Sequence, residues 1–185
     1  MARSRGKSPA RKMKPVFLVL CEGETEEAYL GYLRQTYRSP IKIVPKVTGD
    51  SICPKLVAKK KKEVKLSSNE HIKVFLMYDR DVETINTKID ECEGVFLFSN
   101  PCVELWFLLH NKEIGFFLKT EACIAALKRV GGAWANYQKP IITETQKTDL
   151  TEKVQQAIDN AKKLTLFANP STSIYLLVET ILATL

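Results

Sequence analysis

The sequence predicts an α/β fold, in which a small, mainly parallel sheet has helices on both faces and is followed by a C-terminal helical extension. Two observations carry this prediction. Short, nearly continuous apolar runs recur at 16–21, 41–46, 72–78 and 94–98, as is typical of parallel strands buried on both faces. Segments with helix-start signals alternate with these runs, which indicates crossover connections between parallel strands.

The helices follow from local signals. Thr25 is expected to cap the first helix, whose opening turn is acidic. Asp50 or Ser51 is expected to open the second, with Pro54 in its first turn. The expected helical segments are 25–37, 52–66, 82–92 (helix or loop), 102–110, 119–130, 148–163 and 171–184.

The chain is expected to divide into a basic, disordered tail over 1–14, an α/β core over 15–110, and a helical extension over 111–185 that packs on the core. A length of 185 residues with 45% hydrophobic residues is sufficient for one compact domain. No stretch approaches the roughly 18 apolar residues of a transmembrane helix. The basic start lacks the apolar segment of a secretory signal, so we expect a cytoplasmic protein.

Cysteine and histidine are too few and too scattered for several kinds of site. The five cysteines form no CxxC pair, which favours reduced, mostly buried thiols over a disulfide framework or a zinc site. His71 and His110 are the two histidines, so a histidine-rich metal site is excluded. His110 ends the helix expected at 102–110, where we expect a favourable contact with the helix dipole.

The net charge of +7 is unevenly distributed. Six basic residues precede the first strand, Arg11 and Lys12 among them, and leave +1 for the remainder. A second basic run, Lys59, Lys60, Lys61 and Lys62, lies in an expected helix. One interpretation is phosphate attraction, because basic arms and patches bind nucleic acid through counterion release. The other is a tail plus a solvated helix face.

Carboxylates follow two of the apolar runs, and they are the strongest functional signal. Glu22 follows the run at 16–21, with Gly23 allowing a tight turn, and Asp79 and Asp81 follow the run at 72–78. Ligands of open α/β sheets bind beyond the carboxyl ends of the strands. If these strands are neighbours, the three acids form a cluster of oxygen ligands suited to Mg²⁺ or Mn²⁺.

Two further acids leave alternatives open. Glu26 lies four residues beyond Glu22, so it either reaches the metal or serves only as a favourable acid in the first helical turn. Glu104 lies in a segment that is apolar nearly all round, where an ionised carboxylate is costly unless it is paired or coordinated. Its partner is either the metal site or a structural group such as Arg34, Arg80 or a backbone N–H.

Three segments together resemble the RloB-like family. They are 20–30, 78–81 and 99–110, and the most specific part is Asn100-Pro101-Cys102-Val103-Glu104-Leu105-Trp106. The ending from Asn169-Pro170 into an apolar helix is also similar to that family. The resemblance implies a TOPRIM-type domain, with Glu22 as its glutamate and Asp79 and Asp81 as its paired aspartates. It also implies a bacterial phage-defence setting, often beside an AAA-type ATPase.

A metal-dependent endonuclease acting on DNA or RNA, in anti-phage or abortive-infection defence, is therefore the leading hypothesis. Glu22, Asp79 and Asp81 are its expected catalytic residues, Glu26 a further metal ligand, and Glu104 and Arg80 their supporting neighbours. The lysine run, Arg11 and Lys12 are expected to bind nucleic acid, and a homo-oligomer is possible. The alternatives are a non-catalytic subunit that binds nucleic acid or an ATPase, and a HAD-type phosphatase that uses the motif Asp79-Arg80-Asp81-Val82.

Overall fold

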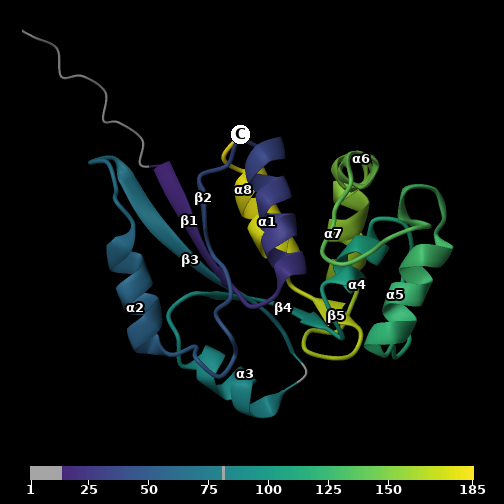
Figure 1. Ribbon diagram of the computed structural model, residues 1–185, viewed down its shortest axis with the longest axis horizontal. Helices are drawn as coiled ribbons and strands as arrows, with labels where there is room; N and C mark the ends of the chain where they lie inside the picture. The colour runs from purple at the N-terminus through teal and green to yellow at the C-terminus, as the bar shows by residue number, and fades with distance from the viewer. Residues whose placement is uncertain (1–13, 81) are drawn as a thin grey trace, which may run out of the picture.

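The computed structural model describes residues 14–80 and 82–185. Its centre is a five-stranded sheet with the order β2-β1-β3-β4-β5 (Figure 1). Neighbouring strands are parallel, except that β5 runs antiparallel to β4. The strands are β1 (Lys14–Cys21), β2 (Ile41–Val44), β3 (Glu70–Asp79), β4 (Val95–Asn100) and β5 (Ser171–Thr172). The predicted α/β class with a mainly parallel sheet is confirmed.

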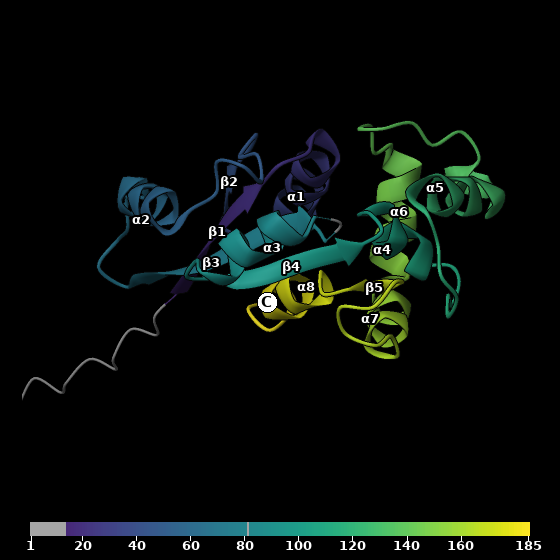
Figure 2. The ribbon, with the colours of Figure 1, turned by 90° about the horizontal axis from the view of Figure 1, so that it is seen from below.

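Helices connect the parallel strands and then form a C-terminal group. Within the described chain they are α1 (Glu24–Thr36), α2 (Pro54–Glu63), α3 (Glu83–Asp90), α4 (Glu104–Leu109), α5 (Thr120–Arg129), the 3₁₀ helix η1 (Gly132–Trp134), α6 (Glu144–Glu152), α7 (Val154–Lys162) and α8 (Tyr175–Leu182). Figures 1 and 2 agree that α5, α6 and α7 gather beyond the β4–β5 side of the sheet, whereas α2 lies at the opposite side.

Alternating side chains of the strands divide the core between the two faces of the sheet. Odd-numbered residues of β1, such as Phe17 and Val19, pack in the larger cluster with α1, α4, α5, α7 and α8. Even-numbered residues, such as Leu18 and Leu20, pack in the smaller cluster with α2 and α3. Each apolar strand therefore has both faces covered, as its nearly continuous hydrophobic run predicts.

Helix α4 is buried throughout and joins the sheet to the C-terminal helices. The indole N–H of Trp106 donates a 2.6 Å hydrogen bond to the Tyr29 hydroxyl of α1. Phe107 stacks on Trp134 with ring centroids 5.6 Å apart. Because both faces of α4 are covered in this way, its first residue, Glu104, is held inside the molecule.

Several helix boundaries differ from the prediction. Helix α1 begins at Glu24 with Gly23 as its N-cap, so Thr25 is inside the helix and does not cap it. The cap of α2 is Cys53 rather than Asp50 or Ser51, although Pro54 does occupy its first turn. After β1 the connection is only two residues long, which sets where α1 can begin, whereas a longer connection over 45–53 precedes α2.

The C-terminal half contains a break and a strand that periodicity does not reveal. The segment expected as one helix over 148–163 is two helices, α6 and α7, that meet at Lys153. The segment expected as a helix over 171–184 begins with β5, and α8 starts only at Tyr175. Strand β5 is two residues long, and Ser173 supports it by donating from its hydroxyl to the Phe96 carbonyl. Within the described chain, no helix is both long and apolar enough to cross a membrane.

Candidate active site at the carboxyl edge of the sheet

The carboxyl ends of β1 and β3 lie at the point where the strand order reverses. The chain goes from β1 outward to β2 on one side, and it later returns to β3 on the other side of β1. Such a switch point is the usual ligand-binding place in open α/β sheets. The register pairs Cys21 with Met77, so continuing it by one residue places Glu22 beside Tyr78, directly before Asp79.

Glu22 is exposed at this edge, and its charge reaches two neighbours. Burial raises the pKa of Tyr78, and the Glu22 carboxylate raises it further. Glu22 also contributes to raising the pKa of Glu26 on α1. The effect of Glu22 on the pKa of Tyr78 therefore agrees with the predicted proximity of Glu22 to the end of β3.

Glu26 folds back over the turn that connects β1 to α1. A Cβ atom on Gly23 would lie 2.1 Å from Glu26 Oε2, so the missing side chain of Gly23 makes room for this carboxylate. Glu26 is buried, and burial raises its pKa, while its own backbone N–H lowers it; the charges of Glu104 and Glu22 raise it again. Glu26 is thus a buried acid within electrostatic reach of Glu22 and Glu104, rather than a solvated residue of the first helical turn.

Glu104 is a further acid on the same side of the sheet, and it follows β4, the strand next to β3. It opens α4 four residues after β4 ends, and its side chain is 0% exposed. Its Oε1 atom accepts a 2.9 Å hydrogen bond from the Tyr137 hydroxyl and pairs with Lys139 Nζ, also at 2.9 Å. The other oxygen, Oε2, is buried and has no hydrogen-bond partner within the described chain.

Two structural partners were considered for Glu104 from the sequence, Arg34 and Arg80. Neither of them forms its ion pair within the described chain. The ion pair forms with Lys139, in the connection between η1 and α6, because that connection returns across the start of α4. Burial lowers the pKa of Lys139, but the Glu104 carboxylate outweighs burial and holds this pKa above its ordinary value, with a smaller contribution from Asp79. Nothing in the residue pattern around Tyr137 and Lys139 signalled this role.

The structure therefore brings Glu22, Glu26, Glu104 and Asp79 into one electrostatic neighbourhood, with Lys139 as its cation. In residues 14–80 and 82–185, no three His, Cys, Asp or Glu side chains form a ready-made metal cluster. The donor set nevertheless fits a hard divalent cation. Carboxylate oxygens are its preferred ligands, the Glu104 Oε2 atom lacks a partner, and an added cation would relieve the repulsion around Glu26.

Several predicted site residues lie elsewhere or outside the description. Asp81, Arg11 and Lys12 are outside the described residues. The lysine run occupies the second half of α2, where Lys60 pairs with Glu63 and Lys61 pairs with Glu93, just before β4 begins. That position is at the amino end of the parallel strands, so the structure does not bring the run to the edge that carries Glu22 and Asp79.

Arg80 follows Asp79 directly, and its backbone N–H donates a 2.9 Å hydrogen bond to the Ser99 carbonyl of β4. Its guanidinium lies over the ring of Phe167, 4.1 Å from the centroid. Arg80 is thus placed beside the acidic edge by β3 and β4, although it does not contact Glu104 in the way considered from sequence.

The expectation for His110 is wrong. This residue is fully buried, its Nδ1 atom is 2.8 Å from the Trp106 carbonyl, and burial lowers its pKa to about 4. His110 is therefore neutral at physiological pH and does not act as a positive charge on the helix dipole. Its burial follows from the packing of α4 on the C-terminal helices.

A parallel sheet with acids beyond neighbouring strand ends defines an α/β protein with a candidate phosphate-processing or metal-binding edge. The chain belongs to the RloB-like protein family, because the model of that family matches residues 17–181. This match covers strands β2 to β5, β1 from its fourth residue onward and helices α1 to α7, together with the candidate site. No curated protein and no solved structure matches the chain.

Proposed function

We propose that this protein is a metal-dependent endonuclease that hydrolyses phosphodiester bonds of DNA or RNA, in anti-phage or abortive-infection defence. One observation carries the proposal: the acid that follows β1 and acids of α1, β3 and α4 share one electrostatic neighbourhood at the switch point of the sheet. Like charges are kept together at a cost, and such arrangements are concentrated at functional sites.

Mg²⁺ or Mn²⁺ is the proposed cofactor, and Glu22, Glu26 and Asp79 would hold it together with Asp81, which lies outside the described residues. When bound, such an ion neutralises phosphate oxygens and stabilises charge on the leaving oxygen. Glu104 supports the set from inside the molecule, because its pairing with Lys139 fixes one of its oxygens.

The reaction that these residues would perform is attack by water on phosphorus. The oxygen of water forms a bond to phosphorus, the bond from phosphorus to the leaving oxygen breaks, and the leaving oxygen takes up a proton. Glu22 is exposed beside the end of β3 and is the proposed acceptor of the proton that water loses. Lys139 limits the negative charge that an incoming phosphate meets, since it lies within electrostatic reach of Asp79 and Glu104.

The test is cleavage of plasmid, single-stranded DNA and tRNA by the purified full chain with Mg²⁺ or Mn²⁺. Asp79→Asn is expected to reduce cleavage about 100-fold or more, the scale of loss when a charge-stabilising group is removed. Asp90→Asn is the matched control, because Asp90 is an exposed carboxylate at the end of α3. It is expected to leave cleavage unchanged.

The proposed AAA-type ATPase partner is added in a second set of reactions, since activity in this setting can depend on it. If all three substrates remain intact with and without the partner, the nuclease proposal fails. Retention of biological activity by Asp79→Asn would instead favour the non-catalytic subunit. Release of phosphate from p-nitrophenyl phosphate would favour the phosphatase alternative.

A further inference from the structure

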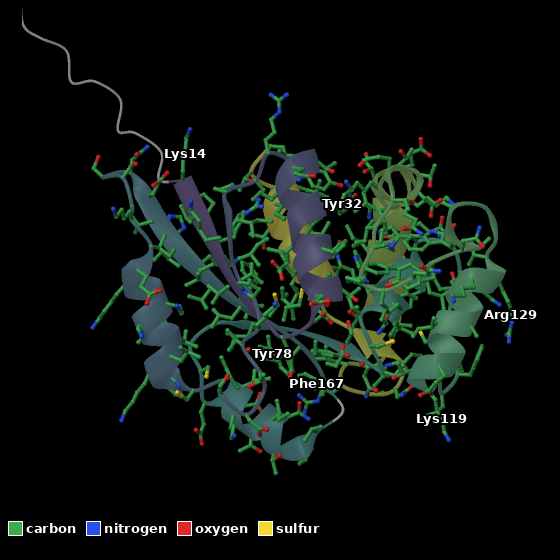
Figure 3. The ribbon with its side chains drawn as sticks, viewed as in Figure 1. Lys14, Tyr32, Tyr78, Lys119, Arg129 and Phe167 are labelled. Carbon is green, nitrogen blue, oxygen red and sulfur yellow. The ribbon has the colours of Figure 1, made fainter. Side chains whose placement is uncertain are left out.

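Arg80 belongs to a stack of side chains beside the proposed active site. The rings of Phe98, from β4, and Phe167 pack at a tilt, with centroids 4.8 Å apart, and the Arg80 guanidinium lies over Phe167. Phe96 flanks the guanidinium, 6.0 Å from its carbon. We call Phe98, Phe167 and Arg80 the Arg80 stack. Arg80 follows the last residue of β3, so the stack lies near the end of that strand; Figure 3 labels Phe167 and, within β3, Tyr78.

The contacts that the described residues make with the Arg80 guanidinium are with aromatic rings. No ion pair within the described chain includes it. A guanidinium that packs over an aromatic ring is attracted by the ring without using its N–H groups as an ion pair would, so these donors remain suited to an anion. Arg80 directly follows Asp79, the last residue of β3, so an anion bound by Arg80 would lie at the same edge of the sheet as the acidic site.

Both the exposure and the backbone conformation of Phe167 are unfavourable for a bulky apolar residue. Its side chain is 48% exposed, and its backbone φ of +66° is in the left-handed region that bulky residues rarely adopt. Its loop is nevertheless well fixed: Asn169 donates to the Asn100 side chain at 3.0 Å and to the Leu118 carbonyl at 2.8 Å. Strain combined with exposure and a fixed loop is more typical of a binding residue than of a packing residue.

More aromatic surface lies on the loop that Asn169 ties to this one. Leu118 N–H donates to Asn169 Oδ1 at 2.9 Å, and the two residues before Leu118 are Phe116 and Phe117. Their side chains are 60% and 68% exposed. Two joined loops at the same side of the sheet thus present three exposed phenylalanine rings and one cation held on an aromatic ring.

We propose that the Arg80 stack binds an unpaired nucleotide adjacent to the phosphate that is cleaved, so that the substrate is single-stranded at the site. This inference rests on the proposed nuclease function. Arg80 holds the phosphate of that nucleotide, and the exposed part of Phe167 contacts its base. Aromatic residues combined with arginine are the usual way in which proteins bind single strands without sequence preference.

The chemistry favours an unpaired base over a duplex. In a duplex the base faces contact one another, so an exposed phenylalanine cannot stack on them without disrupting the pair. A site for duplex alone needs cations along the backbone and gains nothing from three exposed rings. The combination of rings and cation next to Asp79 therefore fits a strand whose bases are free.

The test measures binding of the full chain to fluorescein-labelled 12-nucleotide single strands, as DNA and as RNA, and to the matching DNA duplex. EDTA is present, so cleavage cannot interfere. Phe167→Ala is expected to weaken single-strand binding about tenfold and to leave duplex binding unchanged. Phe167→Trp is expected to retain binding, and Phe167→Leu, which keeps the apolar volume, is expected to lose it like alanine.

A strand that contains 2-aminopurine supplies a second readout, because stacking quenches its fluorescence, and Phe167→Ala is expected to abolish that quenching. Leu66→Ala is the matched control: Leu66 is an exposed apolar residue just before β3, at the opposite end of the strand. Equal single-strand binding by Phe167→Ala and the wild type overturns the inference. So does normal strand binding by Phe167→Ala combined with lost binding to the ATPase partner, because these rings would then be a protein-docking surface. Neither result bears on the Asp79→Asn cleavage test, so the two proposals fail separately.

Discussion

At the scale of single residues, Glu26 is the most informative acid of the site. It is buried, its pKa is raised chiefly by burial, and two other acids contribute to that rise. A group whose pKa is higher in the folded than in the unfolded state adds stability at low pH, and this stability is lost as the pH rises through the folded pKa. Ionised Glu26 therefore opposes folding at neutral pH.

Glu26→Gln is expected to raise the melting temperature at pH 7.5, because the amide keeps the shape and removes the buried charge. The gain should shrink as the pH falls through the raised folded-state pKa and should be lost below about 4.5, the ordinary pKa of the group, since Glu26 is then protonated in the wild type in both the folded and the unfolded state. The same variant is expected to lose cleavage, which would be a trade of activity for stability. Thermal unfolding followed by circular dichroism at several pH values provides the measurement.

Glu27→Gln is the control for this experiment, because Glu27 lies in the same helical turn but is only half-buried. It is expected to give no gain at pH 7.5, since a carboxylate near a helix N-terminus is favourable there. A melting temperature of Glu26→Gln at or below that of the wild type at pH 7.5 would contradict the account of Glu26 as a destabilising charge.

The residue scale also shows where sequence reasoning ends. Glu22 and Asp79 could be predicted because each follows an apolar strand, and a strand end is a local feature. Glu104 could be recognised as a costly buried acid, but its partner could not. Lys139 lies 35 positions away along the chain, in a connection between helices, and only the tertiary packing brings it to Glu104.

At the scale of elements, the turn from β1 into α1 determines where Glu26 can lie. Gly23 has an ordinary extended backbone, with φ of −91°, so its value is the space that it leaves for the Glu26 carboxylate. Gly31, in the middle of the same helix, has no neighbouring atom within 4 Å of an added Cβ. One helix thus contains a glycine required for space and a glycine with no such role.

Gly31→Ala is expected to stabilise the protein by about 1 kcal/mol, because alanine is the better helix former, and to raise the melting temperature by about 2–4 °C. Cleavage should be unchanged. Gly23→Ala is expected to displace the Glu26 side chain and to reduce Mn²⁺ affinity and cleavage about tenfold, in the range seen when groups that position metal ligands are lost. Calorimetric Mn²⁺ titration and thermal unfolding compare the two variants directly.

Equal effects of the two substitutions on Mn²⁺ affinity would contradict the role assigned to Gly23. The pair is informative because the chemical change is the same and the helix is the same. Only the presence of the Glu26 carboxylate at the added Cβ differs between the two positions.

The elements themselves were predicted well where the hydrophobic pattern is long. The four parallel strands and the helices between them follow from apolar runs and start signals. Strand β5 could not be predicted, because two residues form it and because the hydroxyl groups of Thr172 and Ser173 bond to the β4 backbone. The break at Lys153 could not be predicted either: Lys153 pairs with Asp149 one turn earlier and makes a tertiary contact with Asn111, and α7 begins at the next residue.

At the scale of the whole molecule, the lysine run of α2 is separated from the acidic site. The sheet concentrates acids at the carboxyl ends of its strands, whereas the lysine run of α2 lies toward their amino ends. Residues 2–13 carry five lysines and arginines and no acid. A polyanionic substrate must therefore be attracted by cations near the site, such as Arg80 and Lys139, or by this N-terminal segment.

Deletion of residues 2–13 is the last prediction, and it separates these sources of attraction. If the segment contacts phosphates, its removal should make the salt dependence of single-strand binding shallower. The slope of log K against log salt should change by up to about 3, because each phosphate contact on a single strand contributes roughly 0.7. Fluorescence anisotropy at 50 to 300 mM salt, with EDTA present, measures the slope.

Replacement of Lys59 and Lys62 by alanine removes two positive charges at a different place for comparison, since both are exposed and neither forms an ion pair within the described chain. This variant is expected to keep the wild-type slope, because α2 carries these lysines away from the acidic edge. The opposite pattern would be a shallower slope for the α2 variant and an unchanged slope for the deletion. It would mean that the bound nucleic acid extends across the sheet toward the amino ends of the β-strands. The path of the substrate would then leave the Arg80 stack on the far side of the active site.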